Sequence, residues 1–242
     1  MFALLVKWTF LGCLVLLPVA CWQADALPAD LDLVADLARD PDQSEVREAP
    51  FDVEQGGVRY RVEPLYRYRL QGLVVSRRAH DGDSMLHGRW NDHLNVADVC
   101  VVWGHNTGID LQAFEFWSGQ FTCFFRTDDP AAWRSFDLTR MANNHLLSDD
   151  DYLRERIAAV RVGDQIEFEG YLARYSNDSG FERGTSVTRT DTGNGACETV
   201  YVTRFRVLRD SPSVWPALQS TAGFGLLGSV LLWVIGALRG WL

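Results

Sequence analysis

Residues 165–172 read Gln-Ile-Glu-Phe-Glu-Gly-Tyr-Leu, with apolar side chains at every second position. Successive side chains of a β-strand point to opposite faces, so this pattern predicts a strand with one buried face. That face carries Ile166, Phe168, Gly170 and Leu172. A glycine where a side chain is expected predicts the close approach of another backbone or of an aromatic ring.

Further strands are indicated on both sides of this segment. Residues 66–74 alternate, with Tyr66, Tyr68, Leu70, Gly72 and Val74 on one face. Residues 199–208 alternate in the same way, with Tyr201, Thr203, Phe205 and Val207 on one face. Residues 96–103 form an apolar run that only Asp98 interrupts, which is typical of a central strand. Two aromatic segments, 114–117 and 121–125, flank a short polar turn and predict a hairpin.

One short helix is predicted at about 149–161. Ser148 and Asp151 have capping-box spacing, and Leu153, Ile157 and Val160 then fall on one face. The chain is therefore expected to be mainly β, a β-rich α+β domain. We expect a small antiparallel barrel or a curved sheet, and favour an OB-like arrangement.

Both ends of the chain are apolar. Lys7 precedes an uncharged run at 8–22, and Ala24-Asp25-Ala26 fits a small-x-small cleavage site. Residues 1–26 are thus interpreted as a signal peptide or a retained N-terminal anchor, with lipidation of Cys21 as a third interpretation. Residues 221–242 are predicted to hold a transmembrane helix, because no charge occurs between 211 and 238.

The positive residues Lys7 and Arg239 lie near the two ends of the chain, which predicts that both ends are cytoplasmic. The middle of the chain is then expected in the periplasm, anchored in a bacterial inner membrane. The glycines of the C-terminal helix predict contact with another envelope or membrane protein. They are Gly223, Gly225, Gly228 and Gly236.

Charge divides the middle of the chain. Residues 30–54 hold nine acids and two arginines, whereas 55–210 hold 22 acids and 19 arginines. We therefore predict an acidic linker at 27–55, a globular domain at 56–210 and a second linker at 211–220. A domain without excess positive charge is not expected to bind nucleic acid.

Residues 185–198 form the most unusual segment. Cys197 could act as a nucleophile with His145 as its base, and Asp191 or Glu198 could orient that base. Arg189, Asp191 and Glu198 could instead hold a polar ligand. The alternative is a long hairpin connection whose short polar side chains bond to the loop's own backbone.

His80, His87 and His93 are candidate metal ligands, although their spacing matches no compact metal motif. A solvated loop is the alternative. Cys100 and Cys123 are both expected in buried strands, so either a disulfide or two buried thiols is possible.

Several motifs resemble those of a family of uncharacterised bacterial membrane-associated envelope proteins. They are Trp103-Gly104, Asn143-Asn144-His145-Leu146 and Thr188-Arg189-Thr190-Asp191-Thr192-Gly193-x-Gly195-Ala196-Cys197-Glu198. The resemblance implies that the domain is a recurring unit, and it implies no catalytic residue.

The sequence contains no phosphate-binding glycine loop, serine-hydrolase elbow, HExxH or CxxC motif. We therefore expect a membrane-anchored periplasmic binding or assembly module with no cofactor and no catalytic activity of its own. A thiol-dependent enzyme using Cys197 and His145, or a metal-binding envelope protein, is the alternative.

Overall fold

The computed structural model describes residues 2–80, 85–193 and 196–240. Gly195 of the family-like motif lies outside these residues. The chain divides into two compact units, which we describe separately. One comprises Leu27–Ser211, and the other comprises Met1–Ala26 with Pro212–Leu242.

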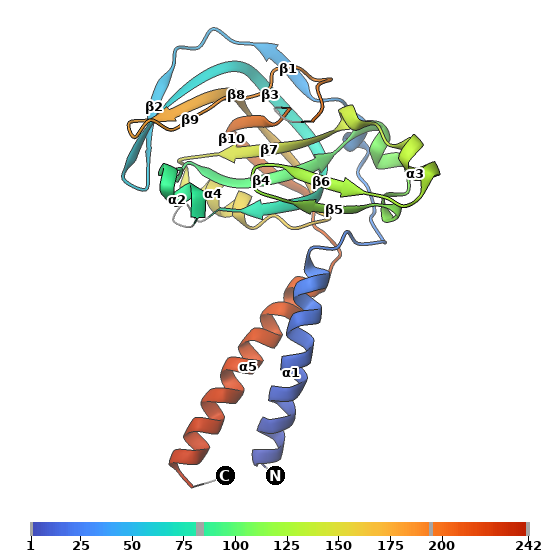
Figure 1. Cartoon of the computed structure of the whole chain (residues 1–242), viewed down its shortest axis with the longest axis vertical. Helices are drawn as coiled ribbons and strands as arrows, with labels where there is room; N and C mark the ends of the chain where they lie inside the picture. The colour runs from blue at the N-terminus through green and yellow to red at the C-terminus, as the bar shows by residue number, and fades with distance from the viewer. Residues whose placement is uncertain (1, 81–84, 194–195, 241–242) are drawn as a thin grey trace. The chain divides into compact units, whose positions relative to one another are not determined.

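The first unit is built on one strongly curved eight-stranded sheet (Figure 1). Its strands are β1 (Asp42–Glu45), β2 (Phe51–Gln55), β3 (Val58–Ala79), β4 (Asn95–Val102), β7 (Met141–Leu147), β8 (Gln165–Asn177), β9 (Glu182–Arg183) and β10 (Glu198–Arg209). The remaining strands, β5 (Glu115–Ser118) and β6 (Cys123–Arg126), form the predicted aromatic hairpin.

The long strand β3 gives the sheet its curvature. It pairs with β8 along residues 60–73 and with β4 along residues 73–79. The pairings β4–β7, β7–β10 and β10–β8 complete a ring of five strands in an OB-like order. The β-rich fold class is confirmed, and of the two expected arrangements the structure shows the curved sheet and not the antiparallel barrel. The reason is that β7 and β10 run parallel, and β1, β2 and β9 extend the sheet beyond the ring.

The inner face of the ring forms the main core. All five ring strands contribute to it, and its members include Tyr68, Val99, Leu146, Phe168 and Val200. The predicted apolar face of 66–74 is confirmed by Tyr68, Leu70 and Val74. In β10 the four residues expected on one face do not share it. A bulge between Val202 and Arg204 places Phe205 and Val207 on the core side with Val200 and Val202, so the prediction is wrong at Tyr201 and Thr203.

The predicted helix is α4 (Asp151–Ala158), and Ile157 buries it against the main core. Its capping differs from the expectation. The Asp150 carboxylate accepts the Leu153 N–H at 2.9 Å, so Asp150 is the N-cap residue. Ser148 lies two residues earlier, and its hydroxyl accepts the Asp150 N–H.

A second layer covers the outer face of β3 and β4. It contains the hairpin β5–β6, a short helix α3 (Pro130–Ser135) and single turns at Gly104–Gly108, Leu111–Ala113 and Leu138–Arg140. A second core lies beneath it, built on Leu73, Val75, Cys100 and Val102. A Cys100–Cys123 disulfide joins this layer to β4, so the disulfide alternative is confirmed.

The acidic segment 27–55 is not a linker. β1 pairs with residues 66–69 of β3, and β2 pairs with residues 58–62. Upstream of β1, Gln165 accepts the Val34 N–H at 2.7 Å and donates to the Asp32 carbonyl at 2.9 Å. Acids of the segment 27–55 pair with arginines of β3, as in Arg61–Asp52 and Arg67–Glu48. The acidic composition of the segment therefore reflects sheet pairing.

The second unit contains two helices, α1 (Phe2–Ala24) and α5 (Trp215–Leu238). Each is long and apolar enough to cross a membrane by length and composition. They contact each other through small residues, since a Cβ placed on Gly225 would lie 2.5 Å from Cys13 Sγ. The predicted linker at 211–220 is shorter than expected, because α5 already begins at Trp215.

Gly170 provides a test of the sheet. A Cβ at this position would lie 2.0 Å from the Tyr201 carbonyl oxygen, so another backbone approaches there as predicted. We expect Gly170→Ala to lower the free energy of unfolding by roughly 1–3 kcal/mol through overpacking. Chemical denaturation of the full chain measures this. Gly108→Ala is the control, because no atom lies within 4 Å of a Cβ there. Equal stability of the two variants would contradict the close approach.

Candidate functional site

The loop before β10 bonds to itself, as its residue types predict. Ser186 Oγ donates to the Asp191 carboxylate at 2.5 Å and accepts the Thr188 N–H at 3.1 Å. Thr185 Oγ1 accepts the Thr199 N–H at 2.9 Å, which ties the loop to the start of β10. Asp191 therefore shapes the loop and does not contact His145 in the described structure.

Arg189 and Glu198 form an ion pair on the inner side of β10. The Arg189 guanidinium donates to Glu198 and also to the Tyr68 hydroxyl, at 3.2 Å. Burial of Glu198 raises its pKa to about 7, although the guanidinium beside it acts in the opposite direction. Of the predicted ligand-binding residues, the structure thus brings Arg189 and Glu198 together, whereas Asp191 bonds to Ser186.

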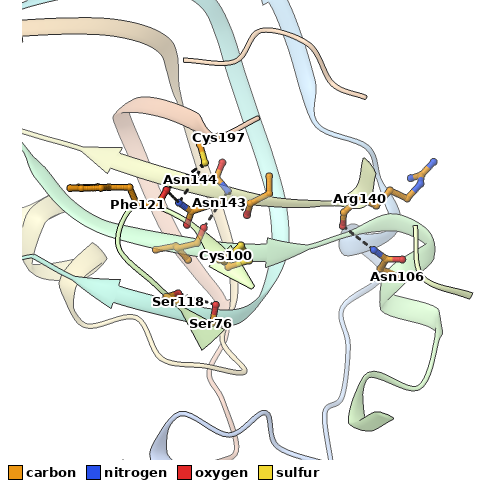
Figure 2. The surroundings of a disulfide bond; sticks show 12 residues. Ser76, Cys100, Asn106, Ser118, Phe121, Arg140, Asn143, Asn144 and Cys197 are labelled. Atoms are coloured by element: carbon orange, nitrogen blue, oxygen red, sulfur yellow. Dashed lines mark hydrogen bonds between the residues drawn. A yellow bond between two sulfur atoms is a disulfide. The ribbon is translucent and has the colours of Figure 1, made fainter. Parts of the chain in front are cut away.

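Cys197 lies on the opposite, outer side of the sheet (Figure 2). Its thiol donates to the Phe121 carbonyl at 3.6 Å, and the Asn143 amide approaches its sulfur at 3.9 Å. Burial raises the pKa of this thiol, which disfavours the thiolate that nucleophilic catalysis needs. No hydrogen bond joins Cys197 to His145 in the described part of the chain.

His145 instead pairs with Asp98, a buried acid that the sequence motifs did not assign to the site. Its Nδ1 lies 2.5 Å from Asp98 Oδ1, and the Nε2 of His80 lies 3.1 Å from the same oxygen. Burial alone would raise the pKa of the Asp98 carboxyl. The charge of His145 and the contacts with both imidazoles outweigh that effect and hold the pKa well below its usual range.

The buried cluster continues from His80 to a second carboxylate. The rings of His80 and His87 are in contact, with centroids 3.8 Å apart and planes tilted by 31°. His87 Nδ1 is 3.0 Å from Asp92 Oδ2. Tyr175 donates to the other oxygen of Asp92 at 2.8 Å. We call His80, His87, Asp92, Asp98 and His145 the histidine–aspartate cluster.

The three candidate metal ligands do not converge. His80 and His87 contact each other through their rings, whereas His93 lies beside Gly56, where a Cβ would be 2.7 Å from the His93 ring. Among the described residues, no group of three His, Cys, Asp or Glu side chains is arranged to hold a metal ion.

A pocket of about 420 Å³ lies close to the cluster. It is formed by α2 (Met85–Trp90), which also carries His87, and by the turn between β8 and β9. Phe121 connects pocket and cluster, because its ring contacts both His87 and Trp90, at centroid distances of 5.1 and 5.4 Å. The pocket residues are Arg89, Trp90, Ser179, Gly180, Phe181, Glu182 and Arg183.

Sequence reasoning missed most of these residues. Asp98 had one signal, since it alone interrupts an apolar run. Asp92 also had a signal, since it lies among the candidate histidines, next to His93. Phe121 and Arg183 had none, because they join the site only through folding.

Comparison with known proteins adds no identification. No family model, curated protein or solved structure matches this chain.

The histidine–aspartate cluster predicts that Asp98→Asn strongly lowers the stability of the fold. This change keeps the shape of the side chain but leaves the buried histidines without their negative partner. We expect a loss of roughly 3–5 kcal/mol in the free energy of unfolding at pH 7, as for other broken buried pairs. Asp128→Asn, at an exposed position, is the control. A loss below about 1 kcal/mol would show that the pair is not strongly coupled.

The raised pKa of Glu198 predicts that the stability of the fold changes with pH in the opposite direction to that expected for a typical salt-bridged acid. The folded pKa of Glu198, about 7, lies above the ordinary 4.5. Its contribution to the free energy of unfolding is therefore fully present below pH 4.5 and is lost as the pH rises through 7. This loss amounts to roughly 3 kcal/mol. Glu198→Gln should remove it, whereas the exposed Glu155→Gln should not. Unfolding measured at pH 4.5, 6 and 8 tests this, and parallel profiles for wild type and Glu198→Gln would contradict it.

Proposed function

We propose that this chain is a membrane-anchored binding module of the bacterial envelope, with the unit Leu27–Ser211 on the periplasmic side of the inner membrane. The observation that carries the proposal is the pair of apolar helices at the two ends of one globular unit. A unit that lies between two spanning helices is held at one membrane surface.

Charge supports the orientation. Lys7 and Arg239 lie at the ends of α1 and α5 that are distant in sequence from the globular unit. Positive residues favour the cytoplasmic side, so the globular unit faces the other side. The Cys100–Cys123 disulfide agrees with this orientation, because disulfides persist in oxidising compartments such as the periplasm.

The environment of Cys197 favours binding over thiol catalysis. A buried thiol with a raised pKa that donates to a backbone carbonyl is poorly activated as a nucleophile. The described part of the chain offers a pocket instead, between α2 and the turn that joins β8 to β9. The resemblance to bacterial envelope proteins agrees with such a role.

A partner at the membrane is also proposed. Gly225 of α5 lies against α1, whereas Gly223 and Gly228 have no other side chain within 4 Å of an added Cβ. The large apolar residues Phe224, Leu227 and Leu231 are also exposed. This open side of α5 is where we propose contact with another membrane protein.

Reporter fusions test the topology. A reporter active only in the periplasm should be active when fused after Ser213 and inactive when fused after Leu242, because α5 returns the chain to the cytoplasm. An insertion near Gln43 is unsuitable, since this residue belongs to β1. A matched reporter that is active only in the cytoplasm should give the reverse result. Activity of the periplasmic reporter at both sites would show that α5 does not span, and its activity only after Leu242 would reverse the orientation.

A further inference from the structure

Arg183 has unmet hydrogen-bonding capacity. Its Nη1 is buried and has no hydrogen-bond acceptor among the described residues. The guanidinium lies over the Phe121 ring, 4.4 Å from its centre, and also lies 5.7 Å from the centre of the Phe181 ring. Aromatic faces stabilise a cation but do not accept its N–H groups as an oxyanion would. A buried donor without an acceptor costs free energy, and arginine cannot avoid that cost by losing its proton.

Carboxylates of the described residues do not neutralise this pocket. Neither Arg89 nor Arg183 forms an ion pair there, and the one acid in the pocket, Glu182, lies 3.7 Å from Arg174. Two cationic side chains therefore face a cavity of about 420 Å³ with one acid, which is shared with a third arginine.

The walls of the pocket are held in place before any ligand binds. Asn177 donates to the Trp90 carbonyl at 2.8 Å, which fixes the end of α2. The side-chain oxygen of Asn177 accepts the Ser179 N–H at 3.0 Å and the Phe181 N–H at 3.2 Å, which fixes the turn between β8 and β9. Trp90 and Phe181 also stack, at 5.6 Å. Preorganised walls reduce the entropy lost on binding.

We propose that this pocket binds a small molecule that carries a phosphate or a carboxylate, with Arg183 as the principal anion-binding residue. An oxyanion supplies the acceptor that Nη1 lacks, and a guanidinium presents paired donors with the geometry of such anions. Arg89, which is exposed at the same pocket, adds a second positive charge. The pocket volume suits a ligand of about the size of a monosaccharide.

This inference rests on the proposed function, because it names the ligand class of the binding module. The proposed function and the proposed ligand class can be contradicted independently of each other. Reporter fusions decide the topology whatever the pocket binds, and binding to the purified protein is measured whatever its orientation in the cell.

The test is calorimetric titration of the full chain in detergent with three probes of similar size. They are glucose 6-phosphate, glucuronate and uncharged glucose. We expect at least one charged probe to bind and to raise the unfolding temperature, and glucose to bind at least about tenfold more weakly. A preference for glucose 6-phosphate or for glucuronate distinguishes the two anions. Binding of none of the probes, or equal binding of glucose, would overturn the proposal.

Three variants locate the site. Arg183→Gln should weaken binding of the charged probe by roughly tenfold or more, as expected for the loss of a charge-assisted hydrogen bond. Arg126→Gln is the matched control, because Arg126 is exposed and pairs with Glu115 in the hairpin β5–β6, and neither residue lines the pocket. If Arg183→Gln does not fold, the exposed Arg89→Gln decides the question, with an expected loss of at least about threefold. Unchanged affinity in folded Arg183→Gln, or in Arg89→Gln where only that variant folds, would overturn the assignment.

Discussion

The double pairing of β3 is the constraint on which the rest of the globular unit depends. This one 22-residue strand pairs with β8 along its first part and with β4 along its last part. A bulge after Pro64, within the part paired with β8, and a second after Val74, near the change of partner, accommodate the curvature of β3. The resulting curvature closes an apolar inner face and leaves an outer face that must also be covered. The second layer and the disulfide are that cover.

Strand β4 shows how one strand serves both faces. All eight of its residues are buried. Val99 and Val101 face the main core, whereas Asp98, Cys100 and Val102 alternate with them on the outer side. The outer side therefore holds, in sequence, a buried charge, a disulfide and an apolar contact. Burial of Asp98 is tolerable because His145, His80 and the Asn95 amide all contact its carboxylate there.

Local patterns predicted the elements that periodicity or composition marks along the chain. The strand at 165–172, the apolar run at 96–103, the aromatic hairpin, the helix near 149–161 and the apolar termini all follow from periodicity or composition. β1 and β2 were missed because their pairing is stabilised by acids against the arginines of β3, and such acids resemble a linker in composition. The bulge after Val202 was missed because an inserted residue breaks the period of two on which the prediction relied.

The candidate site was harder to predict, because its members meet from distant segments. His145 lies 47 residues from Asp98, and Asn177 lies 87 residues from Trp90. The structure rejects one part of the thiol hypothesis. The predicted strand at 199–208 left Cys197 and Glu198 outside it, but β10 begins at Glu198, and the extended backbone there turns the two side chains to opposite faces. In the structure Glu198 reaches Arg189, beside Tyr68 of the main core, whereas Cys197 reaches Phe121 in the outer layer. The alternation that identifies a strand therefore also limits which of its residues can act together.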